Sequence, residues 1–207
     1  MDDDYWSAVV QLRLAVADLL EALTPQEWDR PSLCAEWRVR DVAGHLSFVP
    51  TITTWDMVRA APRGRFNPHR INTLLARQHG DRPTHAIVAR IREHAGERRT
   101  ARVLDVRDSL FDVAVHSQDI AVPLGRTVEV PVTSARQGLD RVWEMGWPFR
   151  AQQRLAGLHL RATDTDWERG EGPRVEGTAL TLLLLLTGRT ETARPLLDGP
   201  GVTSIAR

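Results

Sequence analysis

The chain of 207 residues contains no lysine and only one cysteine, Cys34. A single cysteine excludes an intramolecular disulfide, and it is typical of a protein from a reducing compartment. All 27 basic residues are therefore arginines, and they balance 27 acidic residues to a formal net charge of zero. Because there is neither a basic excess nor an acidic tail, we expect no nucleic-acid partner.

The sequence also lacks a long apolar run. The longest, ALTLLLLL at residues 179–186, is far shorter than the roughly 20 residues that span a bilayer, so it predicts a buried helix or strand. The acidic start, MDDDYW, has neither the basic nor the apolar region of a secretory signal. We therefore expect a cytoplasmic protein without a membrane partner.

Helical periodicity dominates the first 125 residues. Apolar side chains at Val9, Leu12 and Val16 form one stripe of a helix, and the pairs Thr24-Pro25 and Asn67-Pro68 each combine an N-cap residue with a proline at the first helical position. Pro50 is expected to kink or divide the helix in which it lies. The helices predicted in this part cover about residues 3–23, 39–60, 68–79, 83–98 and 103–122.

The pattern changes after Gly125. The segment TVEVPV at 127–132 is β-like, and a helix capped by Ser134 should follow it. Alternation over 155–164 predicts a strand, and WERGEGPRV at 167–175 predicts a hairpin that turns at residues 170–173. Gly188 should end the buried helix. We predict a mainly α protein, with a helical bundle over 1–126 and a small α+β domain over 127–207.

Three side chains could form a metal site. Asp112 and His116 are four residues apart, so they share one face of a helix, and His45 lies at the edge of the apolar stripe of another. If these edges converge, one carboxylate and two imidazoles would suit Zn²⁺ or a similar divalent ion and leave a fourth position open. From spacing alone, two other interpretations remain open: His45 packed in the core, and Asp112 and His116 as a surface pair.

Two further residues each allow a structural and a functional interpretation. Asp119 could orient His116 as a hydrogen-bond acceptor, or it could be a solvated charge or a tie to a neighbouring helix. For Cys34, the sequence favours a small buried apolar side chain over a thiolate nucleophile or ligand.

The segment LTPQEWDRPSLCAEWRVRDVAGHL, together with the later carboxylate-x₃-His and DIA..LG, resembles the mycothiol-dependent maleylpyruvate isomerase family of the DinB-like metalloenzyme superfamily. The resemblance extends to LRATDTDWERGEGPRVEGTALTLLLLLTGR near the C-terminus. It implies a DinB-like four-helix bundle with a small second domain. It also implies a divalent metal, usually zinc, on His45, Asp112 and His116, and a catalytic role for Arg189. The sequence departs from the family at Asp112, where the family has glutamate, which is longer by about 1.5 Å.

The resemblance implies a metal-dependent isomerase or S-transferase that uses mycothiol, a low-molecular-weight thiol, on a small electrophilic substrate. A thiolate would attack the substrate, and Arg189 would hold a substrate carboxylate or the developing enolate charge. The alternatives are a non-catalytic metal-binding module or sensor of the same fold, and an interaction protein that has lost the metal. We expect a monomer or a homodimer.

Overall fold

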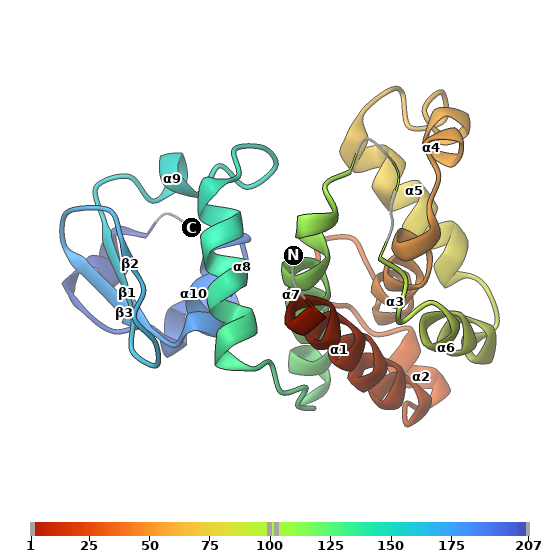
Figure 1. The fold of residues 1–207 in the computed structure, drawn as a ribbon, viewed down its shortest axis with the longest axis horizontal. Coiled ribbons are helices and arrows are strands. Elements are labelled where there is room, and N and C mark those ends of the chain that lie inside the picture. The colour runs from red at the N-terminus through yellow and green to blue at the C-terminus, as the bar shows by residue number, and fades with distance from the viewer. Residues whose placement is uncertain (1–2, 99–100, 102–103, 206–207) are drawn as a thin grey trace. The chain divides into compact units, whose positions relative to one another are not determined.

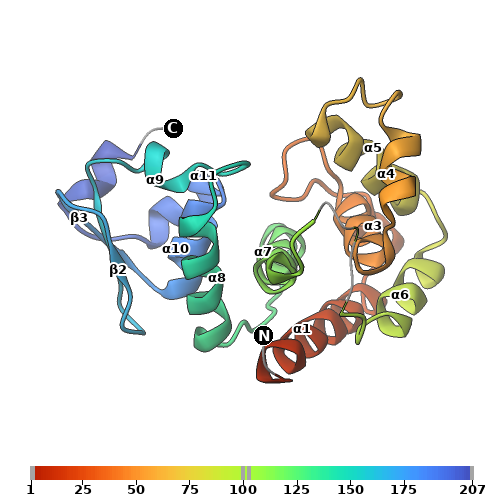
Figure 2. The same ribbon diagram turned by 45° about the horizontal axis from the view of Figure 1, so that its top comes forward.

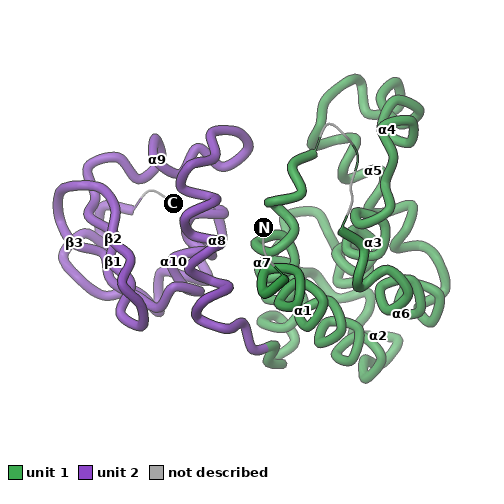
Figure 3. The backbone as a smooth tube through the Cα atoms, in the orientation of Figure 1, with its two compact units in different colours: residues 1–128 green, residues 129–207 purple. Residues whose placement is uncertain are grey.

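The computed structural model describes all residues except 1–2, 99–100, 102–103 and 206–207. The chain divides into two compact units, residues 1–128 and 129–207, which Figure 3 shows in different colours. Among the described residues, no helix is long and apolar enough to cross a membrane.

The first unit is helical throughout. Thr24 caps the second helix through a reciprocal pair of hydrogen bonds with Glu27, and Asn67 caps the fifth by accepting from the Arg70 amide. Both helices have proline at the first position, as the sequence predicts. The helices of this unit are α1 (Asp3–Glu21), α2 (Pro25–Trp28), α3 (Val39–Phe48), α4 (Thr54–Ala60), α5 (Pro68–Gly80), α6 (Thr84–Glu93) and α7 (Ser109–Ala121).

Four of these helices form a closed bundle. Helix α1 packs against α6 and α7, and α3 packs against the same two helices (Figures 1 and 2). The stripe predicted for α1 is buried at Val9, Leu12 and Val16. Because Pro50 divides the expected helix over 39–60, α3 ends at Phe48 and α4 starts separately. The predicted four-helix bundle is therefore confirmed.

Helix α5 is added to the outside of α3 at very short range. A Cβ atom on Gly44 would lie 2.4 Å from the backbone nitrogen of Gly80, and one on Gly80 would lie 2.7 Å from the carbonyl oxygen of Arg40. The two glycines thus let the helix backbones touch. This contact fixes α5 against the helix that carries His45.

The second unit combines helices with a small sheet. Thr178 caps the buried helix α10, and Gly188, with φ of +88°, follows its end as the sequence predicts. Helix α10 packs against α8 and the sheet. The elements are α8 (Val132–Glu144), α9 (Ala151–Arg154), β1 (His159–Ala162), β2 (Glu168–Arg169), β3 (Arg174–Gly177), α10 (Ala179–Leu186) and α11 (Thr190–Ala193).

Three local predictions for this unit are wrong. Residues 127–131 form no strand, and α8 already begins at Val132, so Ser134 is a buried helical residue and not a cap. The segment 167–175 is not a hairpin, because β2 and β3 do not pair with each other. Instead β1 lies between them, antiparallel to β2 and parallel to β3. The predicted small α+β domain is nevertheless confirmed as an architecture.

Candidate metal centre

The three predicted ligands of the first unit lie together. His45 comes from α3, and Asp112 and His116 come from successive turns of α7, which packs beside α3. One donor atom from each lies within 4.8 Å of the other two. Asp112 Oδ1 is 3.3 Å from His45 Nε2 and 3.5 Å from His116 Nε2. The fold thus brings together residues about 70 positions apart in the sequence.

These separations fit a tetrahedral metal. Ligand atoms at 2.0–2.2 Å from zinc, in tetrahedral directions, lie about 3.3–3.6 Å from each other. Both distances from Asp112 Oδ1 fall in that range without any movement of the helices. The shorter aspartate therefore lies at ligand separation from both imidazoles, whose own donor atoms lie within 4.8 Å of each other.

Both imidazoles are oriented by a partner at Nδ1. His45 Nδ1 lies 3.1 Å from Asn72 Oδ1 of α5, and His116 Nδ1 lies 2.8 Å from Asp119 Oδ2. Each of these oxygens can accept a hydrogen bond from Nδ1–H, which leaves Nε2, the nitrogen that faces Asp112, as the one able to bind a metal. A metal-binding histidine usually has such an acceptor behind it.

The charges around His116 favour a cation. Burial alone would lower the pKa of His116, but the Asp112 carboxylate, the Cys34 sulfur and Asp119 outweigh it and raise that pKa to about 10. Burial alone would raise the pKa of the Asp112 carboxyl, whereas His45 and His116 hold it below its usual value. The surroundings thus stabilise positive charge between the three donors.

Trp37 covers the two imidazoles. Its ring stacks on His116 with a centroid distance of 6.0 Å and tilts over His45 at 5.4 Å, while its Nε1 donates to Thr73 Oγ1. The side chains of His45 and His116 are only 7% and 13% exposed. Asp112 is 24% exposed, so the cluster is reached from its side.

Cys34 is not the buried apolar side chain that the sequence favours. It is half-buried, and its thiol donates to Asp119 Oδ2 at 3.0 Å, with Sγ 3.8 Å from His116 Nδ1. Cys34, His116 and Asp119 form a second group of possible ligand atoms. However, His116 Nδ1 is already bonded to Asp119, so this group supports the orientation of His116.

Two residues that orient or cover the cluster were not assigned a role from the sequence. Asn72 lies on α5, 27 positions after His45, and no motif links the two. For Trp37, the sequence carries no signal beyond that of a large apolar side chain. Arg189 lies in the second unit, where its guanidinium donates to the carbonyl of Thr187. Its role in activity stays a prediction from the family resemblance.

Comparisons with known proteins identify the N-terminal domain and the fold. Residues 9–109 match the family model described as the mycothiol maleylpyruvate isomerase N-terminal domain. The matched range includes His45 and ends three residues before Asp112. No curated protein sequence matches the chain.

Two solved structures share the fold. One is a histidine-to-alanine mutant of the mycothiol-dependent maleylpyruvate isomerase, with a TM-score of 0.66 and 12% identity, covering 96% of this chain and 92% of that one. The other is the mycothiol-dependent maleylpyruvate isomerase, with a TM-score of 0.61 and 13% identity, covering 90% of this chain and 89% of that one. Residues 9–109 thus match a mycothiol maleylpyruvate isomerase N-terminal domain, which supports the family resemblance of the sequence, and the two solved structures share the fold of the chain.

Proposed function

We propose that the protein is a metal-dependent isomerase or S-transferase that uses a low-molecular-weight thiol, mycothiol, on a small electrophilic substrate. The observation that carries this proposal is the separation of 3.3 and 3.5 Å between the donors of His45, Asp112 and His116. Three such donors fit a divalent ion, with zinc favoured by the two imidazoles, and leave a fourth position free. The family name supports mycothiol as the thiol.

A divalent ion held by these residues would supply positive charge that lowers the pKa of a thiol at the open position. The chain contributes the geometry. Asn72 and Asp119 hold the two imidazoles in the tautomer that presents Nε2, and Trp37 shields both rings from water. The partial exposure of Asp112 leaves an approach for the thiol and its partner.

The reaction classes differ in the fate of the carbon–sulfur bond. In an isomerisation, the thiolate adds to one carbon of a conjugated double bond, the former double bond rotates, and elimination releases the thiol unchanged. In a transfer, the thiolate displaces a leaving group and the new carbon–sulfur bond remains. Arg189 is proposed to bind a carboxylate of the substrate or the enolate charge that develops on addition.

Metal analysis of protein purified without a histidine tag tests the first part of the proposal. We expect close to one equivalent of zinc or a similar ion in the native chain and loss of it in Asp112→Ala, with Asp4→Ala as an exposed control. Less than about a tenth of an equivalent in the native chain would contradict the proposal.

Thiol consumption tests the second part. The metal-loaded protein is mixed with mycothiol and a panel of small electrophiles, and both thiol loss and double-bond isomerisation are followed. Turnover that disappears in Asp112→Ala supports the enzyme. A metal-loaded protein that acts on no electrophile would instead indicate a metal-binding module or sensor, the alternative suggested by aspartate at a position where the family has glutamate.

A further inference from the structure

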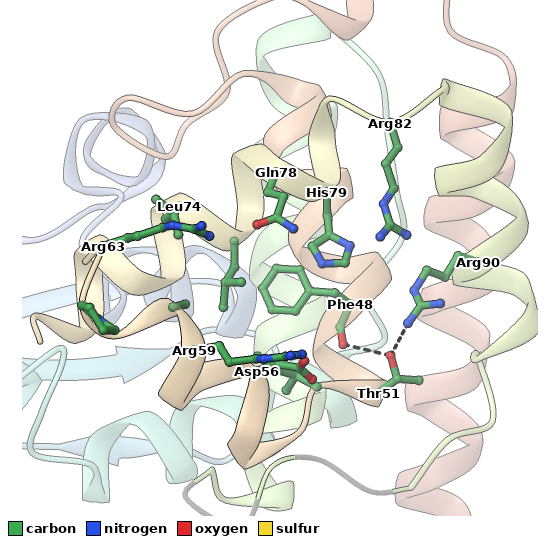
Figure 4. Close-up of a pocket in the computed structure, with 14 residues that line it drawn as sticks. Phe48, Thr51, Asp56, Arg59, Arg63, Leu74, Gln78, His79, Arg82 and Arg90 are labelled. Carbon is green, nitrogen blue, oxygen red and sulfur yellow. Dashed lines mark hydrogen bonds between the residues drawn. The ribbon is translucent and has the colours of Figure 1, made fainter. Parts of the chain in front are cut away.

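The first unit contains a cavity that is separate from the candidate metal centre. None of the three candidate ligands lines it. Its volume is about 650 Å³, and it is bounded by the end of α3, by α4 and the turn after it, and by α5 and α6. Figure 4 shows the side chains that surround it. The candidate metal centre does not account for this cavity.

The cavity is strongly positive. Four arginines line it, Arg59, Arg63, Arg82 and Arg90, against a single carboxylate, Asp56. Asp56 is already engaged, because its Oδ2 accepts from the amide and the hydroxyl of Thr53 at the start of α4. Within the described part of the chain, none of the four arginines forms an ion pair with a carboxylate. The carboxylate of Asp56 offsets one of the four positive charges, so the cavity keeps a net positive charge.

The positive charge of the cavity also affects the pKa of His79, which lines it. Burial lowers the pKa of His79 to about 4, and the charges of Arg82 and Arg90 act in the same direction. The imidazole is therefore neutral near pH 7, and it does not add to the charge. A neutral histidine can donate or accept one hydrogen bond at each nitrogen.

Two buried nitrogen atoms in the wall lack a partner. Among the residues that the structure describes, His79 Nδ1 and Arg90 Nε are the buried side-chain nitrogen and oxygen atoms without a hydrogen bond. Arg90 is otherwise held in place, because one of its terminal nitrogens donates to Thr51 Oγ1 at 2.6 Å. Buried polar groups are normally satisfied, so these atoms indicate a partner that the chain does not supply.

Arginines lie on opposite sides of the cavity. Figure 4 shows Arg82 and Arg90 on one side and Arg63 on the other, with Phe48 between, whereas Arg59 lies beside Asp56. The lining also contains the apolar side chains Ile52, Leu74 and Leu75. An arginine fork pairs well with a carboxylate or a phosphate. The apolar middle matches a short hydrocarbon segment.

We propose that this cavity binds a small dianion with one acidic group at each end and a short apolar segment between them. Carboxylate and phosphate groups share the chemistry that the arginines on the two sides recognise. The ring of Phe48 lies against both sites, 4.8 Å from the ring of His79 and 5.5 Å from that of His45. A bound dianion would thus lie on the other side of Phe48 from the candidate metal centre.

Isothermal titration of the full-length protein tests this proposal without any turnover. The probes are glutarate, a dicarboxylate; butyrate, a monocarboxylate of similar length; and 3-phosphonopropionate, which has a phosphonate at one end in place of a carboxylate. The variants are Arg63→Gln, Arg82→Gln and the double variant, one arginine from each side. Arg30→Gln is the matched control, because Arg30 is exposed and does not line the cavity.

We expect one of the dianions to bind in the native chain and in Arg30→Gln. Each single variant should weaken that binding about tenfold and the double variant about a hundredfold, and added salt should weaken it further. Preference for glutarate indicates carboxylates at both ends, and preference for 3-phosphonopropionate indicates a phosphate group at one end. Three results would each overturn the proposal: no binding of either dianion, butyrate as tight as glutarate, or equal binding in the double variant.

Discussion

Lengthening Asp112 to glutamate should weaken metal binding in this chain, although the family has glutamate at the same place. In the structure, Asp112 Oδ1 already lies 3.3 and 3.5 Å from the two imidazole nitrogens, which is the separation that tetrahedral ligands require. An added methylene moves the carboxylate by about 1.5 Å, whereas ligand distances tolerate about 0.2 Å. Either the glutamate must fold back or α7 must move away from α3.

The loss in affinity can be bounded. Removing a partner behind a ligand typically costs 10- to 100-fold in metal affinity, so displacing a direct ligand should cost at least tenfold, about 1.4 kcal/mol. Competition between the protein and a zinc-binding dye measures this for the native chain, Asp112→Glu and the exposed control Asp4→Glu. Equal or tighter zinc binding by Asp112→Glu would refute the reasoning from the distances, because it would mean that the helices lie further apart than described.

Three other predictions follow from named contacts. Asp119→Asn removes the charge behind His116 and should lower zinc affinity about 10- to 100-fold in the same competition, with an unchanged circular dichroism spectrum; unchanged affinity would contradict its orienting role. Gly44→Ala places a Cβ 2.4 Å from the backbone of α5 and should cost about 2 kcal/mol in urea unfolding, whereas Gly96→Ala, in open space, should be near neutral; equal effects would refute the close helix contact. His79 binds a proton more weakly in the folded state, where burial and then Arg82 and Arg90 lower its pKa to about 4, so stability is full above about pH 6.5 and falls as the pH drops toward 4. Because His79 is only partly buried, we expect a loss of about 1 kcal/mol between pH 7 and 5 that is absent in His79→Gln; the same loss in both proteins would assign it elsewhere.

Local signals predicted the helical elements well. Thr24-Pro25 and Asn67-Pro68 start α2 and α5, and Gly188 follows α10, because capping bonds and backbone preference depend on neighbouring residues. The same kind of reasoning failed at TVEVPV and at the expected hairpin. Valine and threonine alternation favours a strand only when a partner strand is present, and β3 pairs with β1 in parallel by tertiary packing.

In the candidate site, too, some features follow from local sequence and others only from tertiary packing. The four-residue spacing of Asp112 and His116 puts both on one side of α7, which any helix of that sequence would do. The placement of His45 opposite them depends on the packing of α3 beside α7. The hydrogen bond from Asn72 depends in turn on α5 lying against Gly44. Neither the position of His45 opposite Asp112 and His116 nor its contact with Asn72 has a local signal in the sequence.

By itself, the sequence determined where several helices begin, which faces they bury, and which residue types are available as ligands; the expected helices over 83–98 and 103–122 are shorter in the structure, at Thr84–Glu93 and Ser109–Ala121. These properties follow from hydrogen bonds and side-chain periodicity over a few residues. The tertiary structure decided that Asp112 reaches two imidazoles, that Cys34 contacts Asp119, and that four arginines surround one cavity. Such arrangements join residues tens of positions apart, and their separations are set by how closely whole helices pack.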